Sequence, residues 1–316
     1  MSTLLILFEL KPEQVQQIQS LVPDWTIISG QADTITDEQR RSAEVVLGWD
    51  SAMAGVLDSD CRLKWVQTSS AGVDKLPLDK FRELGIHLTS ASGIHPISMA
   101  ETLFAMLLSF NRNLHLAIRN QSQREWKVSE RYDQLSGKTM GIIGVGTIGI
   151  EIARLAGAFG MRTVGIRRSA DPLAGIDRMY GMEQLDDVLS QSDVVVNVLP
   201  YTEDTHHLFN AERFGKMRPS ALFFNLGRGP SVDTDALVRA LDDGNLRGAG
   251  LDVFETEPLP SEHPLWTMEN VIITPHIGGW TSQYKQKVAD ILLHNLHAYI
   301  TTGKPARNVV DFSRSY

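Results

Sequence analysis

The chain has 316 residues, of which 42% are hydrophobic and 22% are charged, and its formal net charge is −8 at pH 7. That length favours two domains and excludes a peptide or a lone binding module. The composition is close to average globular usage, which excludes a disordered protein. The acidic balance disfavours binding to nucleic acid or to an anionic membrane, because both would need clustered Lys and Arg.

Cysteine usage and hydropathy narrow the class further. Cys61 is the single cysteine, so no intrachain disulfide and no CxxC metal or redox pair can form. We therefore expect a reducing, cytoplasmic location, and we assign no metal site. The apolar start at 3–8 is too short for a signal-peptide core, and no apolar run approaches the roughly 18 residues that cross a bilayer.

The first hundred residues alternate short β-rich runs with polar helical stretches. Such alternation is typical of a mainly parallel sheet with helices on both faces. The predicted strands are 4–8, 45–48, 65–68 and 86–89, and the predicted helices between them include 12–21 and 78–84.

A long helix is predicted from His95-Pro96, because proline suits a first turn and apolar residues then recur at helical spacing to Phe110 or beyond. A second series of strands and helices follows it. A final helical pattern at 282–300 has no strand after it, so we expect it to cross back and cover the first sheet. The strands of the second series are predicted at 140–143, 163–166, 194–198, 221–225, 248–252 and 271–274.

A glycine-rich turn joins the first strand of this second series to a helical segment at 150–159. In such a place Gly144 permits a tight turn, Gly146 lets the backbone approach a pyrophosphate, and Gly149 allows close packing of helix on strand. The helix N-terminus then offers free N–H groups to the phosphates. The pattern favours a dinucleotide-binding turn over the alternative of a glycine-rich turn without a ligand.

The next strand ends in Arg167-Arg168-Ser169, at the place where NAD-binding folds usually carry an Asp or Glu for the ribose 2′-hydroxyl. Two guanidinium groups and a hydroxyl suit a 2′-phosphate instead. We therefore expect NADP(H) to be preferred, with NAD(H) as a second possible cofactor. The alternative is a solvated basic strand end without a ligand.

Three further strand ends carry polar groups with a plain chemical use. They supply the segments 225–229, 251–258 and 274–279, with an Arg, several carboxylates and a His. Open α/β sheets bind ligands at the C-terminal ends of their strands. Any one of these groups alone would more often be structural, so the signal lies in their convergence.

Together these residues and spacings strongly resemble the D-2-hydroxyacid dehydrogenase family, which includes phosphoglycerate dehydrogenase and glyoxylate/hydroxypyruvate reductases. The resemblance covers nearly the whole chain, from 70–74 to Pro275-His276. It implies that Arg228 binds the substrate carboxylate and carbonyl, that His276 is the acid/base, and that Glu257 holds its imidazole. It also implies that the backbone at Ala71 and Gly72 reaches the carboxylate from the other domain.

The fold expected from these observations is α/β, with two doubly wound parallel-sheet domains, the second a Rossmann domain inserted in the first. The substrate domain is predicted at 1–97 and 287–316 and the dinucleotide domain at 98–286, with the active site in the cleft between them. By the resemblance, Asp252 lies near the nicotinamide amide. The residues assigned to the cofactor from the glycine turn and the basic strand end are Gly144, Gly146, Gly149, Arg167, Arg168 and Ser169, and those that the resemblance implies are Thr147, Ile148, Pro200, Thr205, Leu226, Gly227 and Asp252.

The favoured function is NADPH-dependent reduction of a small 2-oxo acid to the D-2-hydroxy acid, with glyoxylate and hydroxypyruvate as leading candidates. One alternative is an NAD-linked D-2-hydroxyacid or phosphoglycerate dehydrogenase. Another is a dinucleotide-sensing corepressor or scaffold, which would tolerate loss of the acid/base. The resemblance also implies a homodimer formed through the dinucleotide domain. Trp280 either narrows the substrate pocket, packs on a helix or contacts another subunit.

Overall fold

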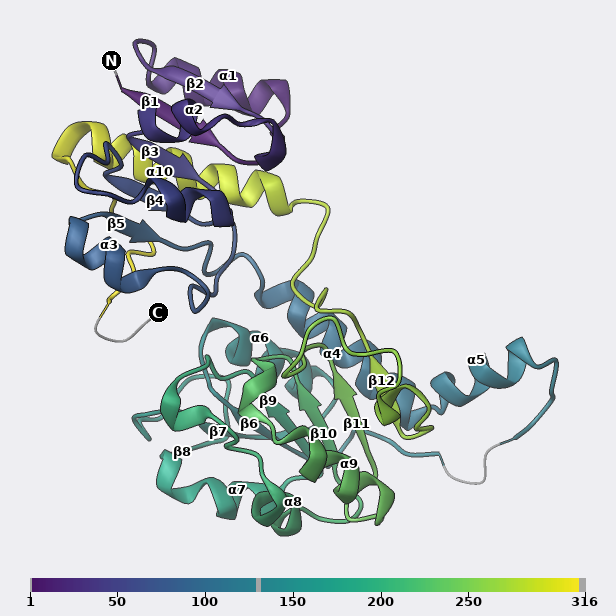
Figure 1. Cartoon of the computed structure of the whole chain (residues 1–316). Helices are drawn as coiled ribbons and strands as arrows, with labels where there is room; N and C mark the ends of the chain where they lie inside the picture. Colours follow the sequence, from purple (N-terminus) through teal and green to yellow (C-terminus); the bar gives the residue numbers. More distant parts are fainter. Residues whose placement is uncertain (1, 129–131, 313–316) are drawn as a thin grey trace. The chain divides into compact units, whose positions relative to one another are not determined.

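The computed structural model of the chain contains two parallel β-sheets, one of five strands and one of seven (Figure 1). The structure describes residues 2–128 and 132–312. The chain divides into two compact units, Met1–Ile94 with Thr281–Tyr316 and His95–Trp280. The predicted α/β class with two parallel sheets is confirmed. The exact domain boundaries, at 97/98 and 286/287, stay a prediction.

The first unit is built on a sheet with the order β2-β1-β3-β4-β5. Its central strands are fully buried and almost wholly apolar, as expected for parallel strands covered on both faces. Its strands are β1 (Thr3–Ile6), β2 (Thr26–Ser29), β3 (Val45–Leu47), β4 (Trp65–Gln67) and β5 (His87–Thr89). Its helices are α1 (Pro12–Leu21), α2 (Asp37–Ser42), α3 (Leu78–Leu84) and α10 (Tyr284–Thr302), with 3-10 turns at Ala32–Thr34 and Ser51–Val56.

The last helix, α10, returns to cover the first sheet. Leu292 of α10 packs in one core with Leu4 and Ile6 of β1. The buried amide of Asn295 donates to Gln67 Oε1 at 3.1 Å, so that a polar contact fixes the position of the helix on β4. Tyr299, one turn further along, packs on the ring of Trp65 with 5.5 Å between centroids. The C-terminal part of the chain is therefore integral to the first unit.

The second unit has the sheet order β12-β11-β10-β9-β6-β7-β8. The chain enters this sheet at the central strand β6, passes outward to β7 and β8, and then returns to the other side of β6 with β9. The order thus reverses between β6 and β9, and ligands bind at such a switch point at the carboxyl ends of the strands. The strands are β6 (Thr139–Ile143), β7 (Arg162–Ile166), β8 (Arg178–Tyr180), β9 (Val194–Asn197), β10 (Leu222–Asn225), β11 (Gly248–Leu251) and β12 (Val271–Ile273).

Helices cover both faces of this sheet. The core on one face includes α4 and α6, and the core on the other face includes α7, α8 and α9. The helices are α4 (Pro96–Asn111), α5 (Leu114–Ser122), α6 (Thr147–Ala158), α7 (Leu185–Gln191), α8 (Ala211–Lys216) and α9 (Thr234–Asp242). The 3-10 turns are Met182–Gln184, Glu203–Thr205, Gly229–Ser231 and Pro264–Trp266.

The long helix predicted from His95-Pro96 ends at Asn111, and α5 follows as a separate helix. Asn113 has a φ of 52°, in the left-handed region, which breaks the helical path between them. No side chain of α5 is buried. Among the described residues, no helix combines the length and the apolar character needed to cross a membrane.

Candidate active site

The glycine-rich turn after β6 has the geometry of a phosphate-binding turn. Gly144 has a φ of 100°, and a Cβ there would lie 2.8 Å from the backbone nitrogen of Leu199, so only glycine fits. At Gly149 a Cβ would lie 3.2 Å from Ile142 of β6, because the helix packs closely on the strand. Nothing lies within 4 Å of a Cβ built on Gly146, which is exposed and precedes α6 directly. The backbone is therefore open on the side where a pyrophosphate would approach.

The basic strand end lies beside this turn. The carbonyl of Ile166, the last residue of β7, accepts hydrogen bonds from the backbone of Gly144 at 3.0 Å and Val145 at 2.9 Å. Arg167, Arg168 and Ser169 follow at once, and all three are at least partly exposed. The backbone of this basic strand end is thus anchored next to the glycine turn.

The other residues assigned to the cofactor lie at the carboxyl ends of strands in the same sheet. Thr147 is exposed and Ile148 half-buried in the first turn of α6. Pro200 is exposed after β9, and its carbonyl accepts a hydrogen bond from the Thr205 hydroxyl at 3.0 Å. Leu226 and Gly227 are buried directly after β10. The Ala71 and Gly72 segment lies in the first unit after β4, where the Ser70 hydroxyl donates to Gly72 O at 2.7 Å.

A buried polar network holds the loop of Arg228. Asn197 and Asn225 end β9 and β10, where they are paired in register, and Asn197 Nδ2 donates to Asn225 Oδ1 at 3.0 Å. Asn197 Nδ2 also donates to Ser231 Oγ at 2.7 Å. The carbonyl of Arg228 then accepts from Asn225 Nδ2 at 3.1 Å and from Ser231 Oγ at 2.6 Å.

The same amides fix the segments that follow both strands. Asn197 Oδ1 accepts from the backbone of Leu199 at 3.2 Å, and Asn225 Oδ1 accepts from the backbone of Gly227 at 3.2 Å. Asn197, Asn225 and Ser231 are at most 1% exposed. Sequence reasoning missed these three residues, although an Asn at the end of each of two apolar strands was a visible signal. Together they fix the backbone of Arg228 and of the segments that follow β9 and β10.

His276 and Glu257 are in direct contact. His276 Nδ1 lies 2.9 Å from Glu257 Oε2, and Glu257 Oε1 accepts from the backbone of Phe254 at 3.0 Å. A carboxylate can only accept, so Nδ1 carries the proton and Nε2 is the nitrogen left for exchange with a substrate. His276 has a φ of 55°, in the left-handed region that is uncommon for residues other than glycine, although His, Asn and Asp adopt it more often than most. Such local strain is often kept at functional sites.

Asp252 holds this strained turn in place. Its carboxylate, only 2% exposed, accepts from the Thr274 hydroxyl at 2.6 Å and from the backbone of Ile277 at 2.9 Å and of Gly278 at 3.0 and 3.1 Å. These donors lie on both sides of His276. Whatever Asp252 contributes to a cofactor, its oxygens already fix the backbone that carries the histidine.

Trp280 follows in the same segment, where its backbone donates to Ile277 O at 2.9 Å. Its side chain is 74% exposed, so the indole contributes little to packing within the described chain.

No cluster of three or more potential metal ligands occurs in residues 2–128 and 132–312. That the protein has no metal site stays a prediction.

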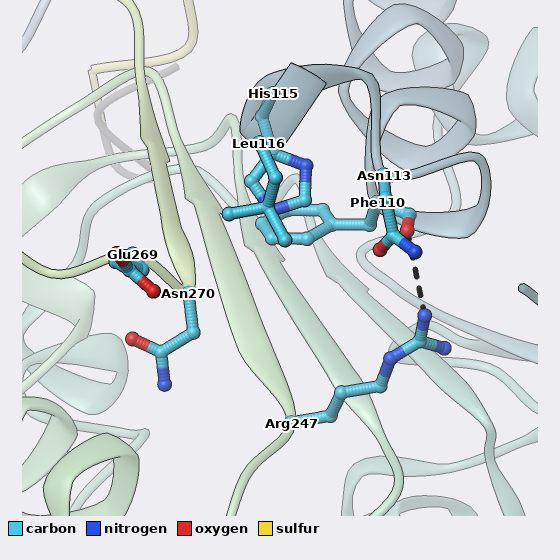
Figure 2. A pocket seen from close by; sticks show the side chains of 7 residues that line it. All are labelled: Phe110, Asn113, His115, Leu116, Arg247, Glu269 and Asn270. Carbon is cyan, nitrogen blue, oxygen red and sulfur yellow. Dashed lines mark hydrogen bonds between the residues drawn. The ribbon is translucent and has the colours of Figure 1, made fainter. Parts of the chain in front are cut away.

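A cavity of about 240 Å³ lies elsewhere in the second unit (Figure 2). Phe110, His115, Leu116, Arg247 and Asn270 are among its lining residues. Arg247 precedes β11 and Asn270 precedes β12, so the cavity lies at the amino-terminal edge of the sheet, opposite the strand ends that carry Arg228 and His276. Burial lowers the pKa of His115 below its usual value, which favours a neutral ring. This cavity is separate from the candidate active site.

Three comparisons with known proteins indicate the same family. Residues 104–278 match the family model described as D-isomer specific 2-hydroxyacid dehydrogenase, NAD binding domain. The curated glyoxylate/hydroxypyruvate reductase B of Escherichia fergusonii is 36% identical over 276 residues, which cover 85% of each chain. A solved family protein from Aeromonas salmonicida is 36% identical, with a TM-score of 0.88 and coverage of 98% of this chain and 99% of that one.

A second solved structure was determined with a cofactor. It is the NADPH-dependent glyoxylate/hydroxypyruvate reductase of Sinorhizobium meliloti in complex with NADP and sulfate. It is 29% identical, covers both chains completely, and superposes with a TM-score of 0.82.

The role of Asp252 in holding the histidine turn is open to test. In Asp252→Asn an NH₂ group replaces one carboxylate oxygen and must face a backbone N–H, so we expect a loss of about 1–3 kcal/mol in the free energy of unfolding. Thr274→Val removes a single donor and should cost less, about 0.5–1.5 kcal/mol. Urea unfolding of both variants measures the difference. Wild-type stability in Asp252→Asn would contradict the assignment.

Proposed function

The chain belongs to the D-isomer specific 2-hydroxyacid dehydrogenase family of NAD(P)-dependent oxidoreductases, and we propose that it reduces a small 2-oxo acid to the D-2-hydroxy acid with NADPH. The observation that supports this most is the 2.9 Å contact between His276 and Glu257, which supplies an oriented proton donor. Glyoxylate and hydroxypyruvate are the proposed substrates, because the curated relative from Escherichia fergusonii and the solved structure from Sinorhizobium meliloti are both named for them.

The proposed roles follow from the chemistry of each side chain. NADPH supplies the hydride when it is bound. As charge builds on the carbonyl oxygen of the substrate, the imidazolium of His276 gives it a proton through Nε2. Glu257 stabilises that imidazolium by its charge and fixes its orientation through Nδ1. The planar guanidinium of Arg228 holds the substrate carboxylate and stabilises the developing oxyanion.

The proposed cofactor site fits the residues present. Gly144, Gly146 and Gly149 shape the turn for the pyrophosphate, with Thr147 and Ile148 beside it. Arg167, Arg168 and Ser169 would bind the 2′-phosphate, and Pro200, Thr205, Leu226, Gly227 and Asp252 would line the rest. For the substrate carboxylate we also propose the backbone N–H groups of Ala71 and Gly72, carried over from the family likeness.

The cofactor preference separates this proposal from an NAD-linked dehydrogenase. NADPH should exceed NADH in kcat/KM with glyoxylate and hydroxypyruvate. Arg167→Ala or Arg168→Ala should weaken NADPH binding by roughly 1.5–3 kcal/mol, or about 10- to 100-fold, and should weaken NADH binding far less. Arg162→Ala, an exposed arginine at the opposite end of β7, is the matched control. Equal use of both cofactors by the wild type would refute the preference.

The acid/base assignment predicts two different defects. His276→Ala should lower kcat by about 10²- to 10⁴-fold and leave the NADPH dissociation constant nearly unchanged, because the proton donor acts in the transition state. Glu257→Gln keeps an acceptor for Nδ1 but removes the charge that favours the imidazolium. Reduction should therefore begin to fail at lower pH than in the wild type. Exposed His294→Ala is the control, and near-normal turnover in His276→Ala would show that the role is wrongly assigned.

A homodimer formed through the second unit is the proposed assembly. Leu114 and Ile118, one turn apart on α5, are 53% and 56% exposed, and Trp126 beyond the helix is 98% exposed. Side chains of this kind favour a protein contact. Light scattering at micromolar concentration should give twice the 35.1 kDa of one chain, and Leu114→Asp with Ile118→Asp should lower the mass. A wild-type mass of one chain would exclude the dimer.

A further inference from the structure

Glu255, two residues before Glu257, connects three segments near the candidate active site. One of its carboxylate oxygens accepts a hydrogen bond from His207 Nε2 at 2.6 Å. The other accepts from the backbone N–H of Thr234 at 2.9 Å and from the Thr234 hydroxyl. Thr234 is the first residue of α9, so the carboxylate also lies at the positive end of the helix dipole.

His207 has a fixed position of its own. It lies in the segment after β9, and its backbone N–H donates to Pro230 O at 2.9 Å, two residues after Arg228. Its φ is 46°, and its ring stacks on His206 with 4.1 Å between centroids. These contacts fix both the backbone and the ring of His207, and they hold Nε2 within hydrogen-bond distance of Glu255.

The loop of Arg228 also touches the loop of Glu255 directly. A Cβ at Gly229 would overlap the carbonyl of Phe254, so the two backbones pack at the closest distance that glycine allows. Phe254 is the residue whose N–H binds Glu257. The peptide against which Gly229 packs is therefore part of the turn that orients the Glu257 carboxylate toward His276.

The contact places a carboxylate against an imidazole and is partly exposed. Burial raises the pKa of Glu255, but hydrogen bonds from Thr234 and His207 outweigh this effect and hold the pKa below its usual value. The side chains of His207 and Glu255 are 40% and 30% exposed. Ion pairs with such exposure contribute little to overall stability. A strong effect of this pair on the reaction would therefore come from local geometry.

We propose that the His207–Glu255 contact is a positioning element, which fixes residues 254–257 against the loop of Arg228 and so sets the geometry of the Glu257–His276 pair. The inference rests on the proposed function, because it assigns what the contact does for the proton donor. His207 and Glu255 act through Glu257 and are positioning residues. His276 remains the group that exchanges the proton.

The first experiment compares pH profiles. Glu255→Ala and His207→Ala should lower kcat/KM by about 10- to 100-fold, because a small displacement of a catalytic group is costly. In both, the alkaline limb of the profile should move to lower pH, the direction expected for Glu257→Gln. Glu255→Gln, which keeps an acceptor, should retain more activity. The double variant should be no worse than the more damaged single one, because both substitutions break one contact.

The matched control breaks an ion pair of similar exposure at the opposite edge of the same sheet. Arg218 Nη1 lies 2.9 Å from Asp193 Oδ1, and their side chains are 44% and 24% exposed. Arg218→Ala should leave the pH profile unchanged. If Glu255→Ala does not fold by circular dichroism, His207→Ala and Glu255→Gln carry the same comparison.

The second experiment needs no turnover. In protein labelled with ¹³C-histidine, the NMR signal of His276, assigned with His276→Ala, should titrate at lower pH in Glu255→Ala and His207→Ala than in the wild type and Arg218→Ala. The same titration in all four proteins would overturn the inference. A wild-type protein that reduces no 2-oxo acid would overturn the proposed function instead, and the NMR titration would still test the contact.

Discussion

The loops of the candidate active site depend on one constraint: a polar group buried at the end of a parallel strand must find its hydrogen-bond partner inside the protein. Asn197 and Asn225 meet this constraint for each other and for the backbone that follows them. A different loop path would leave buried donors unsatisfied, which costs more than a single hydrogen bond contributes. The loops after β9 and β10 are therefore restricted to one arrangement.

Three carboxylates on the loop after β11 extend this arrangement. Asp252 binds the turn around His276, Glu255 binds His207 and Thr234, and Glu257 binds the imidazole. Each carboxylate faces a different segment, so one short loop relates the backbone of the histidine, the start of α9 and the imidazole itself. Three like charges are tolerated close together in sequence because each one accepts from N–H or O–H donors.

Local sequence patterns predicted most of the fold and pointed to the strand ends that form the candidate site. Buried parallel strands produce apolar runs, and the glycine turn, Arg228 and His276 all follow such runs directly. The strands β2 and β8 were missed because both lie at sheet edges, and β2 is partly exposed along its whole length. Neither strand therefore shows a continuous apolar run.

The supporting contacts could not be predicted, because they join segments far apart in the chain. His207 and Glu255 are 48 residues apart, and Asn197 and Asn225 are 28 residues apart. Their meeting depends on which strands are neighbours and in which register. A single sequence does not give that register, so Ser231, Thr234 and Glu255 had no local signal of their own.

The two ends of the second unit are held together, and this affects how the first unit is completed. The Ser98 hydroxyl near the start of the unit donates to Gly279 O near its end at 3.1 Å, and a Cβ at Gly279 would lie 2.7 Å from the ring of His95. Once the second unit has folded, the chain ends that return to the first unit start close together. The entropy lost when α10 joins the first sheet is then that of closing a short loop, although the intervening chain is long.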